Sequence, residues 1–215
     1  LAKQQQRQLD QEIARLRAEL AKPAGDAAEI EKWARGIASE GQGWSVLDPS
    51  VMKSSGGSTF TKLDDRSLLV GGANPGKDTY DIHARTEQRG LTTVRLQALT
   101  HPSLPGGGPG RHSNSNFVLS EFELKAVSVK DPRQSQVVKF SQVRAEYSQQ
   151  NYEIEKTIDG TVTNSNGWAV DGPTRKKPVS AIFVAAVPFG YKGGTELQFR
   201  MRHEANFGTH GVGRV

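Results

Sequence analysis

From Trp44 to the end of the chain, apolar side chains recur at every second position in a series of short runs. Residues 79–86 show this most clearly, since apolar residues at 80, 82 and 84 alternate with polar ones. A period of two is that of a β-strand with one buried face. Gly- and Pro-rich turns separate the runs, and no helical pattern lies between them. The pattern predicts a mainly β fold, an antiparallel β-sandwich over residues 41–215.

Most of the expected strands share this alternation and are bounded by turn residues. They are residues 58–72 as a hairpin about Asp64-Asp65, then 79–86, 91–99, 116–129, 136–148, 179–187 and 195–203. The run 179–187 is apolar throughout, which predicts a central strand buried on both faces.

Residues 1–40 have a different pattern. Four apolar side chains within residues 1–21 follow helical spacing among charged ones, which predicts an amphipathic helix. A turn containing Pro and Gly ends this helix, and Asp26 can cap a second helix over residues 27–38. We therefore expect a helical hairpin or linker ahead of the sandwich, with a coiled-coil dimer as the alternative.

Composition narrows the class of protein. The chain has 215 residues, no cysteine and a net charge of +5. Without cysteine, disulfides, a Cys-ligated zinc and c-type haem attachment are excluded within this chain. No run of about 18 apolar residues is present, so no membrane span is expected. The charges are scattered, so we expect a mildly basic surface and no nucleic-acid partner.

The chain is expected to be part of a longer polypeptide. Its first residue is Leu, and its last residues, GVGRV, resemble the start of a strand that has been cut.

One stretch nearly matches a phosphate-binding loop. Residues 71–77 have the required spacing, but Asp78 stands where Ser or Thr would ligate magnesium. A period-two run follows, so no helix N-terminus is expected there for the phosphates. Asn74-Pro75-Gly76 is therefore interpreted as a turn.

Motifs for catalysis are not found. The five histidines lack metal-ligand spacing, and neither HExxH nor GxSxG occurs. Glu121 and Glu123 alternate along an expected strand and are interpreted as its solvated face. A pair of converging glycosidase carboxylates stays open as an alternative, but the expectation is a protein that is not an enzyme and has no cofactor.

The loop of residues 100–116 is longer than connections in compact domains usually are, which favours a binding role. It carries four candidate ligand-binding side chains: Arg111, His112, Asn114 and Asn116. Amide and guanidinium groups suit the vicinal hydroxyls of a sugar. The competing interpretation is that the asparagines hydrogen-bond the backbone of their own loop.

The remaining candidate binding residues are aromatic residues and Asp159. Trp168 and Trp44 are expected in the core, because aromatic side chains bury a large area. Tyr191, in a Gly-rich turn, is expected to be exposed and able to stack on a sugar ring. Asp159 is a candidate calcium ligand in the second long loop, 159–178. Because calcium takes roughly six to eight oxygens, Asp159 is interpreted more readily as a turn residue.

Several runs carry a resemblance to a known module. WSVLDP, LDDRSLLVGGANPGKDTY, LTTVRLQALTHPSLPGGGPGR and SNFVLSEFEL resemble a module of large planctomycete proteins that also carry cytochrome-c-like domains. RAEYSQQNYEIEKTIDGTVTNSNGWAV is similar to the discoidin or coagulation-factor C-type pattern, whose fold is a galactose-binding-like jelly roll. The resemblance covers residues 44–215. Haem binding in such proteins belongs to a Cys-containing domain that this chain lacks.

The resemblance implies a non-catalytic, lectin-like module of a larger exported protein, in the periplasm or at the cell surface. Its expected ligand is a polysaccharide, and the basic balance of the chain favours an acidic or sulfated one. Neighbouring domains of the same polypeptide are the other expected partners. The alternative is a structural module that docks those domains and binds no small ligand.

Overall fold

The computed structural model describes residues 43–163 and 165–215. Residues 47–215 form one compact unit, separate from residues 1–46. The N-terminal helices expected within residues 1–40 lie outside the described residues. No helix among the described residues is long and apolar enough to cross a membrane.

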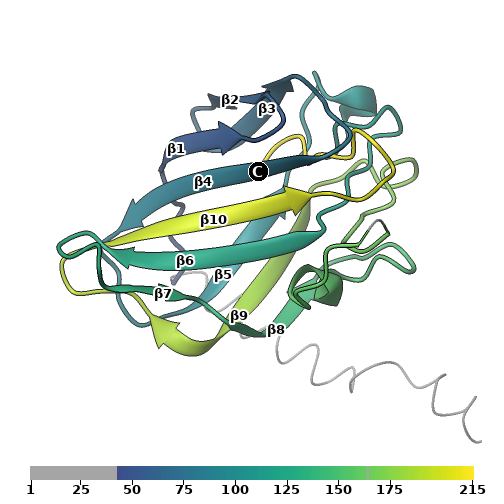
Figure 1. The fold of residues 1–215 in the computed structure, drawn as a ribbon. Coiled ribbons are helices and arrows are strands. Elements are labelled where there is room, and N and C mark those ends of the chain that lie inside the picture. Colours follow the sequence, from purple (N-terminus) through teal and green to yellow (C-terminus); the bar gives the residue numbers. More distant parts are fainter. Residues whose placement is uncertain (1–42, 164) are drawn as a thin grey trace, which may run out of the picture. The chain divides into compact units, whose positions relative to one another are not determined.

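Antiparallel strands build the unit (Figure 1). A five-stranded sheet has the order β1-β4-β10-β6-β7, a three-stranded sheet the order β5-β9-β8, and β2-β3 form a hairpin. The elements are β1 (Pro49–Ser54), β2 (Ser58–Lys62), β3 (Leu68–Gly72), β4 (Asp78–Thr86), β5 (Leu91–Ala98), η2 (Pro105–Gly107), β6 (Glu121–Ser128), β7 (Ser135–Val137), β8 (Phe140–Ala145), η3 (Ile154–Thr157), β9 (Val179–Phe189) and β10 (Thr195–His203).

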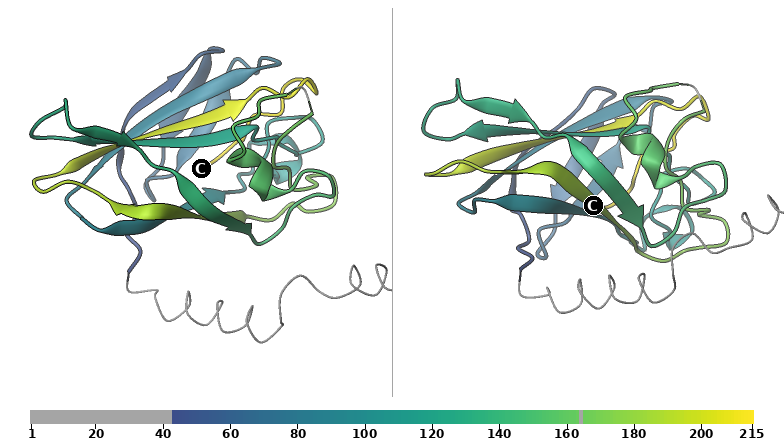
Figure 2. Two further views of the ribbon diagram at one scale, coloured as in Figure 1. Left: turned by 60° about the horizontal axis from the view of Figure 1, so that its bottom comes forward. Right: turned by 90° about the horizontal axis from the view of Figure 1, so that it is seen from below.

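The core lies between the five-stranded and the three-stranded sheets, which form two layers in Figure 2. Phe122 on β6 and Phe183 on β9 meet there with ring centroids 4.2 Å apart, and both are almost fully buried. Phe140 on β8 contacts the ring of Phe183 at 5.2 Å. Contact between residues of both layers establishes the antiparallel sandwich that the alternation predicted.

Strand β4 confirms the period-two pattern. Tyr80, Ile82 and Ala84 are buried on its inner face, and β4 pairs with β1 on one side and β10 on the other. On its outer face Asp81 accepts a hydrogen bond from Nε of Arg200 on β10 at 2.9 Å. The hairpin about Asp64-Asp65 is also confirmed, since β2 and β3 pair on either side of it.

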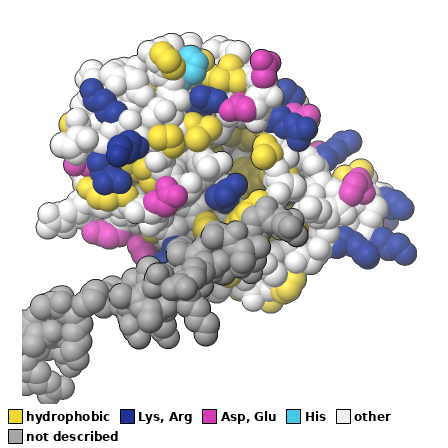
Figure 3. Space-filling view, turned by 180° about the vertical axis from the view of Figure 1, so that it is seen from behind, with side chains coloured by type: hydrophobic (Ala, Val, Ile, Leu, Met, Phe, Trp, Pro, Cys, Tyr) yellow, Lys and Arg dark blue, Asp and Glu magenta, His cyan; other side chains and the backbone are white. Residues whose placement is uncertain are grey.

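Strand β9 is central in its sheet, as predicted, but the prediction of burial on both faces is wrong. Val179, Ala181 and Phe183 are buried, whereas Ile182 and Val184 on the other face are partly exposed. Within the described part of the chain, no third layer covers that face. Seen from behind in Figure 3, charged side chains of both signs lie scattered among hydrophobic ones.

Two predicted strands have different bounds in the structure. The strand expected over 116–129 begins only at Glu121. The run expected over 136–148 is divided between β7, which pairs with β6, and β8, which pairs with β9. Val138, between them, is buried. The chain therefore passes from one sheet to the other at this point.

Candidate functional site

The first residue of β4, Asp78, is a buried carboxylate. Asp78 accepts hydrogen bonds from Oγ of Ser54 at 2.7 Å, from Oγ of Ser58 at 2.6 Å and from the backbone N–H of Gly56 at 2.7 Å. Burial raises the pKa of Asp78, but these donors outweigh burial and hold the pKa below its ordinary value. Asp78 thus joins three strands, and a strand follows it, in agreement with the turn interpretation.

Arg111 lies inside the protein and connects loop 100–116 to the end of β3. Nη1 donates to Oγ of Ser58 at 2.7 Å and to the carbonyl oxygen of Ala73 at 2.8 Å. Nη2 donates to the carbonyl oxygens of Gly71 at 2.9 Å and Gly72 at 3.0 Å. Since Arg111 is 8% exposed and its guanidinium bonds internal oxygen atoms, it serves as a framework for the loop.

The side chains of Asn114 and Asn116 also form hydrogen bonds within the protein. Asn116 is buried; its Nδ2 donates to Oε1 of Gln149 at 2.9 Å, and its Oδ1 accepts from the N–H of Val170. Asn114 is exposed, but its Oδ1 accepts from the N–H of Asn116 at 3.0 Å. Asn114 therefore fits the interpretation in which Asn side chains bond the backbone of their own loop, whereas Asn116 ties the loop to residues 149 and 170.

His112 belongs to a group of four rings at the same end of the sandwich. Its imidazole stacks on that of His210 with centroids 3.9 Å apart and planes at 11°. Phe207 lies edge-on to His210 at 6.2 Å and to Tyr152 at 5.8 Å. Phe207 is 45% exposed and is the one exposed aromatic side chain among the described residues. We call His112, Tyr152, Phe207 and His210 the ring cluster.

A cleft of about 270 Å³ opens between the β2–β3 hairpin and loop 100–116. Leu69 and Pro105 supply apolar wall, and Thr61, Asn74 and Ser103 supply hydroxyl and amide groups. Arg111 lines the cleft as well. The volume is slightly below that of typical small-ligand pockets and suits a single sugar unit.

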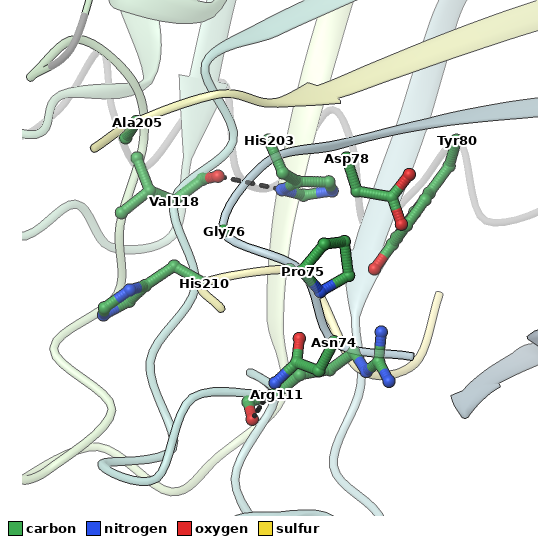
Figure 4. Close-up of a pocket in the computed structure, with 11 residues that line it drawn as sticks. Asn74, Pro75, Gly76, Asp78, Tyr80, Arg111, Val118, His203, Ala205 and His210 are labelled. Carbon is green, nitrogen blue, oxygen red and sulfur yellow. Dashed lines mark hydrogen bonds between the residues drawn. The ribbon is translucent and has the colours of Figure 1, made fainter. Parts of the chain in front are cut away.

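A second, smaller cavity of about 10 Å³ lies beside Asp78, with room for roughly one water molecule. In Figure 4, His203, Asp78 and Tyr80 group on one side of it, while the ring of His210 points away. Nδ1 of His203 bonds the carbonyl oxygen of Val118 at 2.8 Å, and Nε2 has no hydrogen-bond partner among the described residues. Burial lowers the pKa of His203 to about 4, so the ring is neutral at neutral pH.

Tyr191 lies apart from the other predicted site residues. Tyr191 lies just before Thr195, where β10 begins, whereas β10 ends at His203, which lines the small cavity. Tyr191 and the cavity are therefore at opposite ends of this strand. Its ring packs partly against the core, and its N–H donates to Oγ1 of Thr195 at 2.7 Å. The expectation of an exposed ring is therefore met only in part.

Asp159 forms a turn. Its Oδ1 accepts from the N–H of Thr161 at 2.7 Å, and its Oδ2 accepts from Nδ2 of Asn166 at 3.1 Å. The described residues contain no group of three or more His, Asp or Glu side chains that could hold a metal ion.

Glu121 corrects the prediction of a solvated face. The backbone N–H of Gly160 donates to its Oε1 at 3.3 Å, and the side chain is 7% exposed. Burial, with a smaller effect from Asp159, raises the pKa of Glu121 to about 7. Glu123, two residues along β6, remains partly exposed, as predicted. The 159–161 turn covers one of these carboxylates and leaves the other open.

Of the two tryptophans expected in the core, Trp168 is fully buried and donates from Nε1 to the carbonyl oxygen of Tyr147 at 3.0 Å. Trp44 is only partly buried.

The sequence did not predict a role for Phe207, Tyr152 or the cleft residues Thr61, Asn74 and Ser103, because no regular spacing marks them. The aromatic residue in the Gly-containing run EANFGTHG was the one available signal.

The fold and site together define an antiparallel β-sandwich with a preformed cleft at its loop end. Comparison of the chain with protein-family models, with curated proteins and with solved structures finds no match.

Proposed function

We propose that this β-sandwich is a non-catalytic carbohydrate-binding module whose ligand occupies the cleft under loop 100–116. The observation that carries the proposal is the cleft itself. Its wall combines apolar surface at Leu69 and Pro105 with hydroxyl and amide groups at Thr61, Ser103 and Asn74. A sugar presents the same combination, because its ring has an apolar C–H face and a rim of hydroxyls.

Rigidity of the cleft supports binding. Arg111 ties the loop to the carbonyl oxygens of residues 71–73, so the wall is already in place before a ligand arrives. A preformed site loses less conformational entropy on binding than a mobile one. The loop in this proposal is thus a framework for the cleft, with Arg111 and Asn116 holding it from inside.

Charge favours an acidic or sulfated sugar. The chain carries a net charge of +5, and Arg111 is one of the residues that line the cleft. Lys176 lies close to Gly106 in the loop that forms the wall. A carboxylate or sulfate group would meet a positive potential there.

We also infer a jelly-roll connectivity, since jelly rolls place about eight strands in two sheets and this sandwich has five strands facing three. The resemblance of the sequence to discoidin-type modules points the same way. In this proposal the module is part of a larger exported protein, in the periplasm or at the cell surface. Weak binding at each site would be reinforced by neighbouring domains.

The test is a glycan panel probed with the 215-residue chain at physiological salt, beside two variants. Thr61→Tyr places a ring in the cleft from an exposed strand position, and Thr92→Tyr is the matched control on β5. Selective binding that Thr61→Tyr abolishes and Thr92→Tyr retains supports the proposal. Absence of binding across the panel, or equal binding by both variants, contradicts it.

A structural module that docks neighbouring domains is the second candidate. Val137 and Val187 are each 62% exposed, and the Ala186 N–H to Lys139 carbonyl bond brings their segments to one edge of the sandwich. Exposed apolar side chains on neighbouring segments favour a protein contact. If the panel is silent, Val137→Asp and Val187→Asp should alter domain contacts in the longer polypeptide.

A further inference from the structure

We propose that the ring cluster is a second contact subsite beside the cleft, so that the ligand is an extended oligosaccharide chain rather than a single sugar. This inference rests on the proposed function. It adds that the ligand is longer than one sugar unit, and it names the residues that contact the additional units. The ring cluster comprises His112, Tyr152, Phe207 and His210, none of which lines the cleft.

The cleft and the ring cluster adjoin through the backbone. Arg111 lines the cleft, and His112, the next residue, belongs to the ring cluster. Residues 110–112 run antiparallel to residues 210–212: Gly110 bridges Val212, and the N–H of Arg111 donates to the carbonyl oxygen of Gly211 at 2.9 Å. This pairing sets His112 against His210. Asn74 and Arg111, which line the cleft, also line the small cavity beside Asp78, as does His210 of the ring cluster. In this proposal a sugar chain that leaves the cleft continues onto the rings.

The backbone holds Phe207 outward at a conformational cost. Gly208 and Thr209 both have positive φ, at 67° and 48°. A β-branched residue rarely occupies the left-handed region, and such strain persists only where the surrounding structure imposes it. Asn151, before Tyr152, also has a positive φ of 67°. One tight turn thus presents the ring of Phe207 at the surface, and the other places the partly buried ring of Tyr152 beside it.

The chemistry of this surface favours a sugar over a protein partner. Phe207 offers an exposed ring to a C–H face, while the neighbouring Ser113, Asn114 and Asn206 are exposed polar residues that can meet hydroxyls. A stable protein interface buries about 800 Å² on each partner around several apolar anchors. One exposed aromatic side chain with polar neighbours falls short of that and matches the narrow strip of a sugar chain.

The test measures affinity against ligand length. Oligogalacturonides and heparin-derived oligosaccharides, from disaccharide to octasaccharide, are titrated by calorimetry into the wild type and into Phe207→Ala. We expect wild-type affinity to rise about tenfold with length, the factor for one added ring contact, and Phe207→Ala to lose that rise while it binds the disaccharide normally. Phe207→Trp should keep the rise, and Val137→Ala is the control for loss of an exposed apolar side chain.

The two proposals fail differently. If the wild type binds short and long ligands with equal affinity, or if Phe207→Ala retains the full rise, the second subsite is overturned while the cleft proposal stands. If Phe207→Ala also loses the disaccharide, the two contacts are one site and the inference fails. If the wild type binds no oligosaccharide of either series, or of the glycan panel, the proposed function fails and the inference with it.

Discussion

His203 on β10 and Asp78 on β4 occupy directly opposed positions in the ladder between these strands. Asp78 is surrounded by hydroxyl and N–H donors that favour its charged form, whereas burial keeps His203 neutral. Attraction from Asp78 raises the pKa of His203, and repulsion from Arg111 lowers it, but both effects are smaller than that of burial. The pair therefore places one charged and one neutral group side by side in the interior.

This arrangement makes the protein less stable in acid. His203 has a pKa of about 4 when folded against an ordinary 6.5, so between these values the unfolded chain binds the extra proton. The free energy of unfolding should then fall by about 1.4 kcal/mol for each pH unit of acidification in this window. Urea unfolding of wild type and His203→Gln at several pH values checks this. Parallel pH profiles for the two proteins would contradict it.

Glu121 acts in the opposite direction. Its folded pKa of about 7 lies above its ordinary 4.5, so its contribution to stability is present below pH 4.5 and is lost as pH rises through 7. Glu121→Gln should accordingly raise the free energy of unfolding by roughly 1 to 2 kcal/mol at pH 8 and have little effect at pH 4.5. Glu123→Gln, on the same strand but partly exposed, serves as the control. An equal gain at both pH values for Glu121→Gln would count against a buried titrating carboxyl.

Loss of the Arg111 framework should loosen loop 100–116. Arg111→Ala removes a buried side chain together with its bonds to Oγ of Ser58 and to the partly buried carbonyl oxygens of residues 71–73. We expect a loss of about 2 to 4 kcal/mol in the free energy of unfolding. Arg133→Ala, at a side chain that is 91% exposed, should leave thermal unfolding unchanged. A small effect of Arg111→Ala would mean that the loop is held by other contacts.

The sandwich core should be sensitive at Phe183. Its ring contacts Phe122 across the two layers and Phe140 within its own sheet, and it is fully buried. Phe183→Ala is expected to cost about 3 to 5 kcal/mol. Val187→Ala, on the same strand but 62% exposed, provides the comparison in denaturant titrations. Similar midpoints for the two variants would be inconsistent with packing between the sheets at this ring.

Calcium should not stabilise the described unit. The carboxylate of Asp159 already accepts from Thr161 and Asn166, and among the described residues no group of three or more metal-binding side chains includes it. Thermal unfolding with millimolar calcium and with a chelator should give the same midpoint, since calcium needs several oxygen ligands. A rise in the midpoint with calcium that Asp159→Asn removes would reinstate Asp159 as a metal ligand.

The positions of several strands could be predicted from the sequence without any structure. The alternation within β4 and β10 and the hairpin about Asp64-Asp65 are local properties, since a period of two and a tight turn involve only adjacent residues. The absence of intervening helices then restricts the strands to antiparallel layers. On this evidence the antiparallel sandwich could be predicted, as could the rejection of a phosphate loop before Asp78.

The burial or exposure of the candidate functional residues depends on contacts between segments that are far apart in the sequence. Arg111 is internal because its partners lie at residues 58 and 71–73, and Glu121 is buried because the turn at 159–161 covers it. Phe207 is exposed because of a turn whose backbone angles no spacing encodes. The sequence alone determined which residues alternate. Only the tertiary structure decided which faces and loop side chains stay open, because burial is set by whatever packs against a segment from elsewhere in the chain.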